Sequence, residues 1–166
     1  MLSQNGFNEL IANLKKEEGF RDRVYQCTAG VDTIGYGFNV AYLSKAELEL
    51  NDGVIEPMSP KAADKILELK VRALINSVDS WYPWVDELPE AIKIGLYDMA
   101  YQLGIASFGS FKNTHKYLQA KEYDKAIENI RNSKWAKQTP RRANNLMRID
   151  AQKKQQFITN IIYNLF

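Results

Sequence analysis

Residues that favour β-structure are confined to one short segment of this chain of 166 residues, between positions 20 and 40. The segment is rich in β-branched and aromatic residues, and Gly30, Gly35 and Gly37 punctuate it. This composition predicts a β-hairpin or a small three-stranded sheet. Elsewhere the apolar residues recur at helical spacing, so we expect a mostly helical α+β protein.

Two helices are marked by signals at their ends. The first is expected over residues 3–17, with one apolar face, and Gly19 predicts its end. A long helix is expected over residues 59–80, because Ser59 can cap it and Pro60 suits the first helical position. At 1.5 Å per residue this helix would span about 30 Å, enough to connect two lobes.

Helical periodicity continues to the end of the sequence. Further helices are expected at about 89–103, 108–119, 122–131, 133–137, 140–152 and 153–164. Before the long helix, residues 41–57 show a mixed pattern that includes a turn signal at Asn51-Asp52-Gly53. The connections are short, and the pattern predicts a helical bundle after the long helix.

These elements predict one domain over residues 1–166, made of two lobes with a cleft between them. The N-terminal lobe would cover about residues 15–58 and the connecting helix about 59–80. The helical C-terminal lobe would cover about residues 81–166, with the helix at 3–17 packed on it.

Composition excludes several kinds of site and location. No apolar stretch is long enough for a transmembrane helix, and the polar N-terminus does not have the pattern of a signal peptide, so we expect a cytoplasmic protein. Cys27 is the only cysteine, so an internal disulfide is excluded, and one histidine cannot complete a zinc site with it. His115 is expected to be a polar residue on a helix surface.

The net charge of +2 is unevenly distributed, since Lys and Arg outnumber Asp and Glu in residues 121–166. Such a lobe suits an anionic polymer, such as nucleic acid, teichoic acid or peptidoglycan, and it is equally typical of a solvated helical face. No nucleic-acid-binding motif accompanies the basic residues, so nucleic acid is not expected as a partner.

Residues 18–37 have a distinctive order. They read EGFRDRVYQCTAGVDTIGYG, with a Glu-Gly pair, a tyrosine seven residues after the glutamate, and a Thr-Ile-Gly-x-Gly run. Two later motifs follow in register: DMAYQLG over residues 98–104 and SKWAKQTPRRA over residues 133–143. Together they resemble the phage lysozymes, glycoside hydrolase family 24, closest to the lysozymes of T-even phages. The resemblance implies the lysozyme-like fold of two lobes.

Glycoside hydrolysis needs an acid that protonates the leaving oxygen and a second group that supplies or steers a nucleophile. By resemblance, Glu18 falls on the catalytic acid and Thr33 on the residue that helps hold the attacking water. Cys27 falls on the second catalytic acid, which in the family is usually an Asp. Arg142 falls on the arginine that pairs with the catalytic glutamate and clamps the lobes. The positions matching glycan contacts are Asn39, Tyr101, Gln102, Thr114 and Asn129.

The sequence leaves three alternatives open for the role of Cys27 in the reaction. A thiol is mostly neutral at pH 7 and a poorer base than a carboxylate, but its thiolate is a strong nucleophile. Cys27 could attack the sugar directly, with retention of configuration. It could instead assist a water held by Thr33, with inversion. It could also be inert, which would leave a weak enzyme or a glycan-binding protein.

The resemblance implies an endolysin that hydrolyses the β-1,4 bond between N-acetylmuramic acid and N-acetylglucosamine in peptidoglycan. It implies no metal or organic cofactor, a monomer, and release from the host cytoplasm to the cell wall through a holin-type membrane lesion. A virion-associated lysozyme is a second alternative. A catalytically weak or inactive peptidoglycan-binding protein is the alternative of a different class, because of Cys27.

Overall fold

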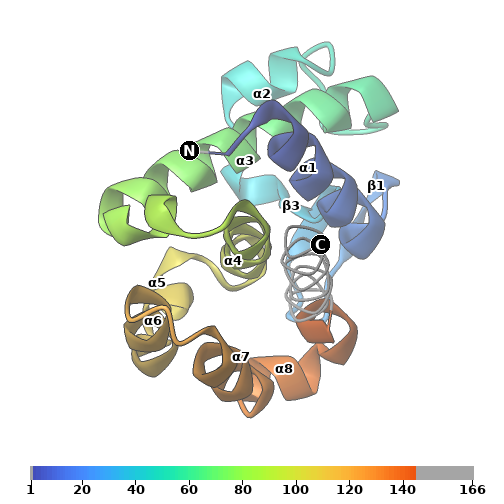
Figure 1. Ribbon diagram of the computed structural model, residues 1–166. Helices are drawn as coiled ribbons and strands as arrows, with labels where there is room; N and C mark the ends of the chain where they lie inside the picture. The colour runs from blue at the N-terminus through green and yellow to red at the C-terminus, as the bar shows by residue number, and fades with distance from the viewer. Residues whose placement is uncertain (1, 145–166) are drawn as a thin grey trace, which may run out of the picture. The chain divides into compact units, whose positions relative to one another are not determined.

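The computed structural model describes residues 2–144. The chain divides into two compact units (Figure 1), and α1 and α3 each contribute residues to both. The first, which we call the sheet unit, is Asn8–Asn76. The second, which we call the helical unit, is Met1–Phe7 together with Ser77–Phe166.

Helix α1 (Gln4–Glu18) forms where the sequence predicts it. The Ser3 hydroxyl accepts a hydrogen bond from the Gly6 backbone N–H at 3.0 Å, which caps the first turn. Gly19 has a φ of 68° and donates its N–H to the Lys15 carbonyl at 3.0 Å, so the helix ends there. The predicted apolar face is buried: Phe7, Leu10, Ile11 and Leu14.

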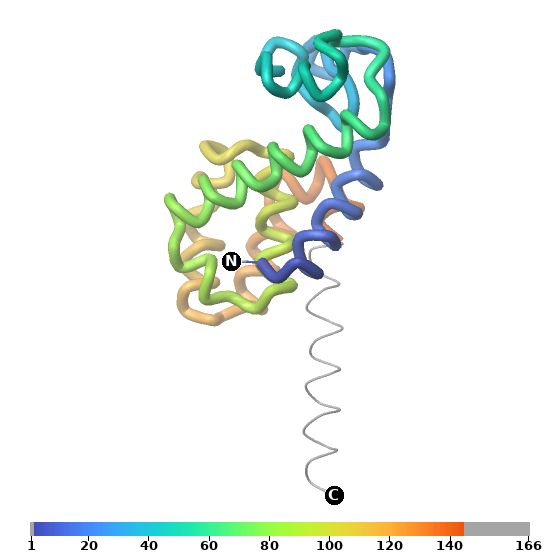
Figure 2. Tube along the Cα trace, turned by 90° about the horizontal axis from the view of Figure 1, so that it is seen from above, coloured from blue at the N-terminus to red at the C-terminus, as the bar shows by residue number. Residues whose placement is uncertain are grey.

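The expected three-stranded sheet is also present. Strands β1 (Arg21–Gln26), β2 (Asp32–Gly35) and β3 (Phe38–Asn39) are antiparallel in the order β1-β2-β3. The turn between β1 and β2 closes when the Cys27 N–H donates to the Val31 carbonyl at 3.0 Å. Figure 2 shows the sheet and the loop that follows it gathered at the N-terminal end of α3.

The segment between β3 and α3 contains structure that the mixed sequence pattern does not predict. A short 3-10 helix, η1 (Val40–Tyr42), precedes α2 (Lys45–Glu49), which begins with a capping box between Ser44 and Glu47.

Asn51 organises the loop after α2 and is itself buried. Its side-chain amide donates to the carbonyls of Val54 (2.9 Å) and Pro57 (3.1 Å). Its side-chain oxygen accepts from the Ser59 N–H at 2.9 Å. The expected turn residue therefore holds the loop that leads into α3.

Helix α3 (Pro60–Trp81) confirms the prediction made from Ser59 and Pro60. The Ser59 hydroxyl accepts from the Ala62 N–H at 3.1 Å. No helix within residues 2–144 is long and apolar enough to cross a lipid bilayer.

The helical unit continues from the end of α3 with short elements and short connections. These are η2 (Pro83–Glu87), α4 (Glu90–Leu103), α5 (Ile105–Gly109), α6 (Lys112–Gln119), α7 (Tyr123–Arg131) and α8 (Lys134–Gln138), and residues 140–144 are again helical. Helix α4 is buried from Lys93 to Ala100, and α6 packs beside α7 (Figure 1).

Of the helices expected from the sequence, one is divided in the structure and two extend beyond or lie outside the described residues. The prediction of a single helix over 108–119 is wrong, because Ser110 and Phe111 are not helical and separate α5 from α6. Of the helix expected over 140–152, only residues 140–144 are described, and the helix expected over 153–164 lies outside the described residues.

The surface position expected for His115 is wrong. Its side chain is buried, with ring centroids of Phe108, Tyr82 and Trp84 at 4.7, 5.1 and 5.2 Å. Burial lowers the pKa of the imidazole, which favours the neutral form. The rings that cover His115 come from separate parts of the chain, so the pattern of its own helix does not reveal them.

Candidate active site

Cys27 and Thr33 meet at the turn between β1 and β2. The Val31 carbonyl accepts two hydrogen bonds, from the Cys27 backbone N–H at 3.0 Å and from the Thr33 hydroxyl at 2.9 Å. Thr33 is buried, on the central strand of the sheet, and its side chain is fixed by this bond. The fold therefore brings two predicted catalytic residues, six positions apart, to one carbonyl group.

The turn changes the acidity of the Cys27 thiol. Hydrogen bonds from the backbone amides of Val31 and Ala29 lower the pKa of Cys27. Such bonds favour the thiolate because its negative charge accepts them. The thiol is also partly exposed to solvent, as a reacting group must be.

Glu18 ends α1 and lies against Gly37, the residue before β3. A Cβ atom on Gly37 would come to 2.9 Å from Glu18 Oε2. Gly37 also has a φ of 78°, a conformation that other residues rarely adopt. A glycine at this position thus allows the Glu18 carboxyl to approach the backbone of the turn between β2 and β3.

Asn39 lies directly opposite Thr33 in the pairing of β2 with β3. Residues paired in this way project to the same face of a sheet. The Asn39 side-chain oxygen accepts from the Ala41 N–H at 2.9 Å and so caps η1. The predicted glycan contact therefore has a structural task of its own.

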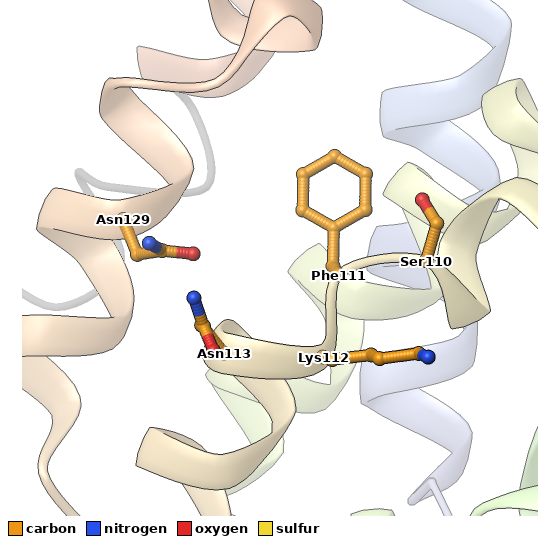
Figure 3. A pocket seen from close by; sticks show the side chains of 5 residues that line it. All are labelled: Ser110, Phe111, Lys112, Asn113 and Asn129. Carbon is orange, nitrogen blue, oxygen red and sulfur yellow. The ribbon is translucent and has the colours of Figure 1, made fainter.

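In the helical unit, two predicted glycan-binding residues are bonded to each other. The Thr114 hydroxyl is buried and donates to the Asn129 side-chain oxygen at 2.8 Å, which ties α6 to α7. Asn129 also lines a pocket of about 370 Å³, in which its side chain and that of Asn113 point toward one another (Figure 3). The full lining is Ser110, Phe111, Lys112, Asn113 and Asn129.

Gln102 and Tyr101 lie in the last turn of α4. The Gln102 side-chain oxygen accepts from the Trp135 indole N–H at 2.8 Å, so α4 and α8 are bonded. Tyr101 is half-buried. Sequence reasoning missed the role of Trp135, although this residue lies in one of the motifs that carry the resemblance.

Arg142 is buried and its guanidinium binds Asp98 within the helical unit. Its Nε and Nη2 atoms both lie 2.7 Å from Asp98 Oδ1. Sequence reasoning did not identify Asp98 as a partner, although it opens the other quoted motif. The expected pairing of Arg142 with Glu18 would join residues of different units and stays a prediction.

The small three-stranded antiparallel sheet followed by helices has the α+β architecture of lysozyme-like glycoside hydrolases. The family model described as phage lysozyme matches residues 15–155. Because the match covers most of the sequence, this chain belongs to the phage lysozyme family.

Two relatives from Dictyostelium discoideum are similar along most of their length. "Probable T4-type lysozyme 2" is 25% identical over 152 residues, covering 82% of this chain and 89% of that protein. "Probable T4-type lysozyme 1" is 26% identical over 155 residues, with the same coverage of 82% and 89%.

Proposed function

We propose that this protein is an endolysin that hydrolyses the β-1,4 bond between N-acetylmuramic acid and N-acetylglucosamine in peptidoglycan, for host-cell lysis. Membership of the phage lysozyme family supports a lytic glycoside hydrolase. The observation that carries the finer assignment is the convergence of Cys27 and Thr33 on one carbonyl, in a sheet whose neighbouring turn contacts Glu18.

In this proposal Glu18 is the general acid. It gives its proton to the glycosidic oxygen as the bond from that oxygen to the anomeric carbon breaks. The oxocarbenium-like centre that develops needs a nucleophile on its other face. After the reaction Glu18 is a carboxylate, and solvent returns its proton.

Cys27 and Thr33 would act on that nucleophile together. Because the Thr33 hydroxyl donates to the Val31 carbonyl, its oxygen is left to accept a hydrogen bond from a water. A Cys27 thiolate, favoured by the backbone amides of Val31 and Ala29, would take a proton from that water as its oxygen bonds to the anomeric carbon. This route inverts the configuration.

Direct attack by the thiolate is the competing route. It would form a thioether to the sugar, and a water that gives its proton to the Glu18 carboxylate would then displace the Cys27 thiolate, so the configuration is retained. The anomer first released, followed by NMR, separates the two routes. Intact-protein mass spectrometry of the reacting enzyme would reveal the thioether adduct only for direct attack.

A catalytically weak or inactive peptidoglycan-binding protein is the second candidate, because a thiol replaces the usual carboxylate at residue 27. Digestion of purified peptidoglycan followed by mass analysis separates the candidates, with Glu18→Gln as the control. New reducing-end muramic acid supports a lysozyme, and anhydromuramic acid indicates a transglycosylase. Glycan that stays intact but retains the protein would establish the binder.

We further propose that the enzyme acts as a monomer without a metal or organic cofactor and stays in the host cytoplasm until a holin-type lesion forms. Cells that express it should therefore remain intact until their membrane is permeabilised, and then lyse. Lysis without permeabilisation would overturn the holin requirement. Light scattering after size exclusion tests the monomer, and activity in excess EDTA tests metal independence.

A further inference from the structure

The Tyr36 ring lies at the centre of an aromatic cluster whose members are close to Glu18 or Gly37 in the sequence. Tyr36 is buried, and its ring centroid lies 5.6 Å from that of Phe20 and 6.3 Å from that of Phe38. Phe20 follows Glu18 by two residues, and Phe38 follows Gly37 directly. The ring therefore packs on segments next to both members of the contact between Glu18 and Gly37.

A polar network ties the same tyrosine to α1 and α3. The Tyr36 hydroxyl donates to Asp64 Oδ1 at 3.0 Å, and the same oxygen lies 2.7 Å from Lys15 Nζ. Lys15 Nζ also lies 5.7 Å from the centroid of the Tyr36 ring. Lys15 precedes Glu18 by three residues, so the network holds the last turn of α1 on the other side of the glutamate.

Stability alone explains this network poorly. The side chains of Lys15 and Asp64 are 33% and 41% exposed, and ion pairs with that exposure contribute little to folding. Burial, followed by the hydrogen bond and charge of Asp64, raises the pKa of Tyr36, so its hydroxyl stays protonated as a donor. The three side chains thus fix the position of Tyr36 relative to α1 and α3, and we take this positioning to be their main effect.

We propose that Lys15, Tyr36 and Asp64 are positioning residues that hold the turn of residues 35–37 against the last turn of α1 and so fix the Glu18 carboxyl for proton transfer. This inference rests on the proposed function of Glu18 as the general acid. Positioning matters because misplacement of a reacting group by about 1 Å can cost about 100-fold in rate.

Steady-state kinetics on soluble peptidoglycan fragments, with thermal melts of each variant, tests the proposal. Tyr36→Phe keeps the ring but removes the donor, and we expect kcat to fall about tenfold while KM stays the same. Asp64→Ala should do the same, and the double variant should be no slower, because both changes break one network. Asp64→Asn keeps an oxygen that can accept from Tyr36 and should recover most of kcat.

Glu47→Ala is the matched control in the same unit. It removes the carboxylate that lies 2.8 Å from Lys70 Nζ, and it also removes the capping box of α2. We expect it to lower the melting temperature at least as much as Asp64→Ala but to leave kcat unchanged. If Tyr36→Phe and Asp64→Ala leave kcat unchanged as well, the network is only structural and the proposal is overturned.

Glu18→Gln separates this failure from a failure of the proposed function. If Glu18→Gln is inactive while the network variants match Glu47→Ala, only the positioning inference fails. If Glu18→Gln keeps wild-type turnover, the proposed function of Glu18 fails first and the inference fails with it.

Discussion

The two units hold their predicted functional residues by different means. In the sheet unit, Glu18 and Cys27 are placed by backbone features: a helix end, a glycine without a side chain, and the amides of a turn. In the helical unit, the predicted functional residues are held in side-chain pairs, such as Thr114 with Asn129 and Arg142 with Asp98. Substitutions of the predicted functional residues should therefore change activity first in the sheet unit and stability first in the helical unit.

The largest expected effect is that of Glu18→Gln on turnover. Loss of general-acid catalysis should lower kcat on purified cell walls by roughly 10² to 10⁴-fold. The melting temperature should stay within a degree or two of the wild type, because the amide is nearly isosteric with the carboxyl. A variant with near-normal turnover would remove Glu18 from the mechanism, and a large loss of stability would break the contrast between the units.

Arg142→Ala should give the largest loss of stability. It leaves the Asp98 carboxylate buried without its charged partner, which costs about 3–5 kcal/mol in free energy of unfolding. In a chain of this size that corresponds to a drop of roughly 10 °C in melting temperature. Differential scanning calorimetry measures both quantities.

Asp98→Asn in the Arg142→Ala background is the control for that interpretation. It removes the negative charge that Arg142→Ala leaves buried without a partner, so the double variant should be more stable than Arg142→Ala alone. If the second change gives no recovery, the buried carboxylate is not the source of the loss. If Arg142→Ala melts at the wild-type temperature, the helical unit does not depend on this pair.

A smaller effect is expected at Thr114. Thr114→Val keeps the shape of the side chain but removes the hydroxyl that donates to Asn129, and this should cost about 1–2 kcal/mol in unfolding by urea. Thr114→Ser retains the donor and is the matched control. If Thr114→Val has the urea midpoint of the wild type, the hydrogen bond contributes nothing to stability.

The smallest expected effect is a shift in the reactivity of Cys27 with pH. Because hydrogen bonds lower the pKa of this thiol in the folded protein, its thiolate should persist to lower pH than in the unfolded chain. The rate of alkylation by iodoacetamide should have its midpoint at a lower pH in buffer than in denaturant. An equal or higher midpoint in the folded protein would show that the turn does not stabilise the thiolate.

Signals at the ends of elements allowed much of the fold to be predicted. Ser59 and Pro60 fix the start of α3, and Gly19 fixes the end of α1, because caps act within one turn of the chain. The signals that separate the β-strands are equally local, since Gly30, Gly35 and Gly37 all adopt the positive φ that their turns require.

Contacts between distant residues could not be predicted in the same way. The partner of Arg142 is 44 residues away, and the rings around His115 come from α5 and from the segment that begins η2. Helical spacing gives a face but not what covers it, so it does not reveal that His115 is buried. The break at Ser110 is different, because Gly109 directly precedes it and is a weak helix former, a local signal that the helix expected over 108–119 did not use.

In the candidate site, too, local features could be predicted and contacts that depend on the folded chain could not. The spacing from Glu18 through Cys27 to Thr33 is local enough for the sequence to indicate which residues share the sheet unit. The hydrogen bonds that lower the pKa of Cys27 come from backbone amides, whose positions depend on the conformation of the turn. Residue types in the sequence therefore do not predict them. The bond from Trp135 to Gln102 likewise appears only when α8 lies beside α4.

The placement of two residue types gives each unit its own spectroscopic reporter. All three tryptophans, Trp81, Trp84 and Trp135, lie in the helical unit, and the only cysteine lies in the sheet unit. Indole emission therefore follows the helical unit alone, while a dye on Cys27 follows the sheet unit alone. One denaturation experiment read in both channels distinguishes a single cooperative transition from two separate ones without any engineered label site.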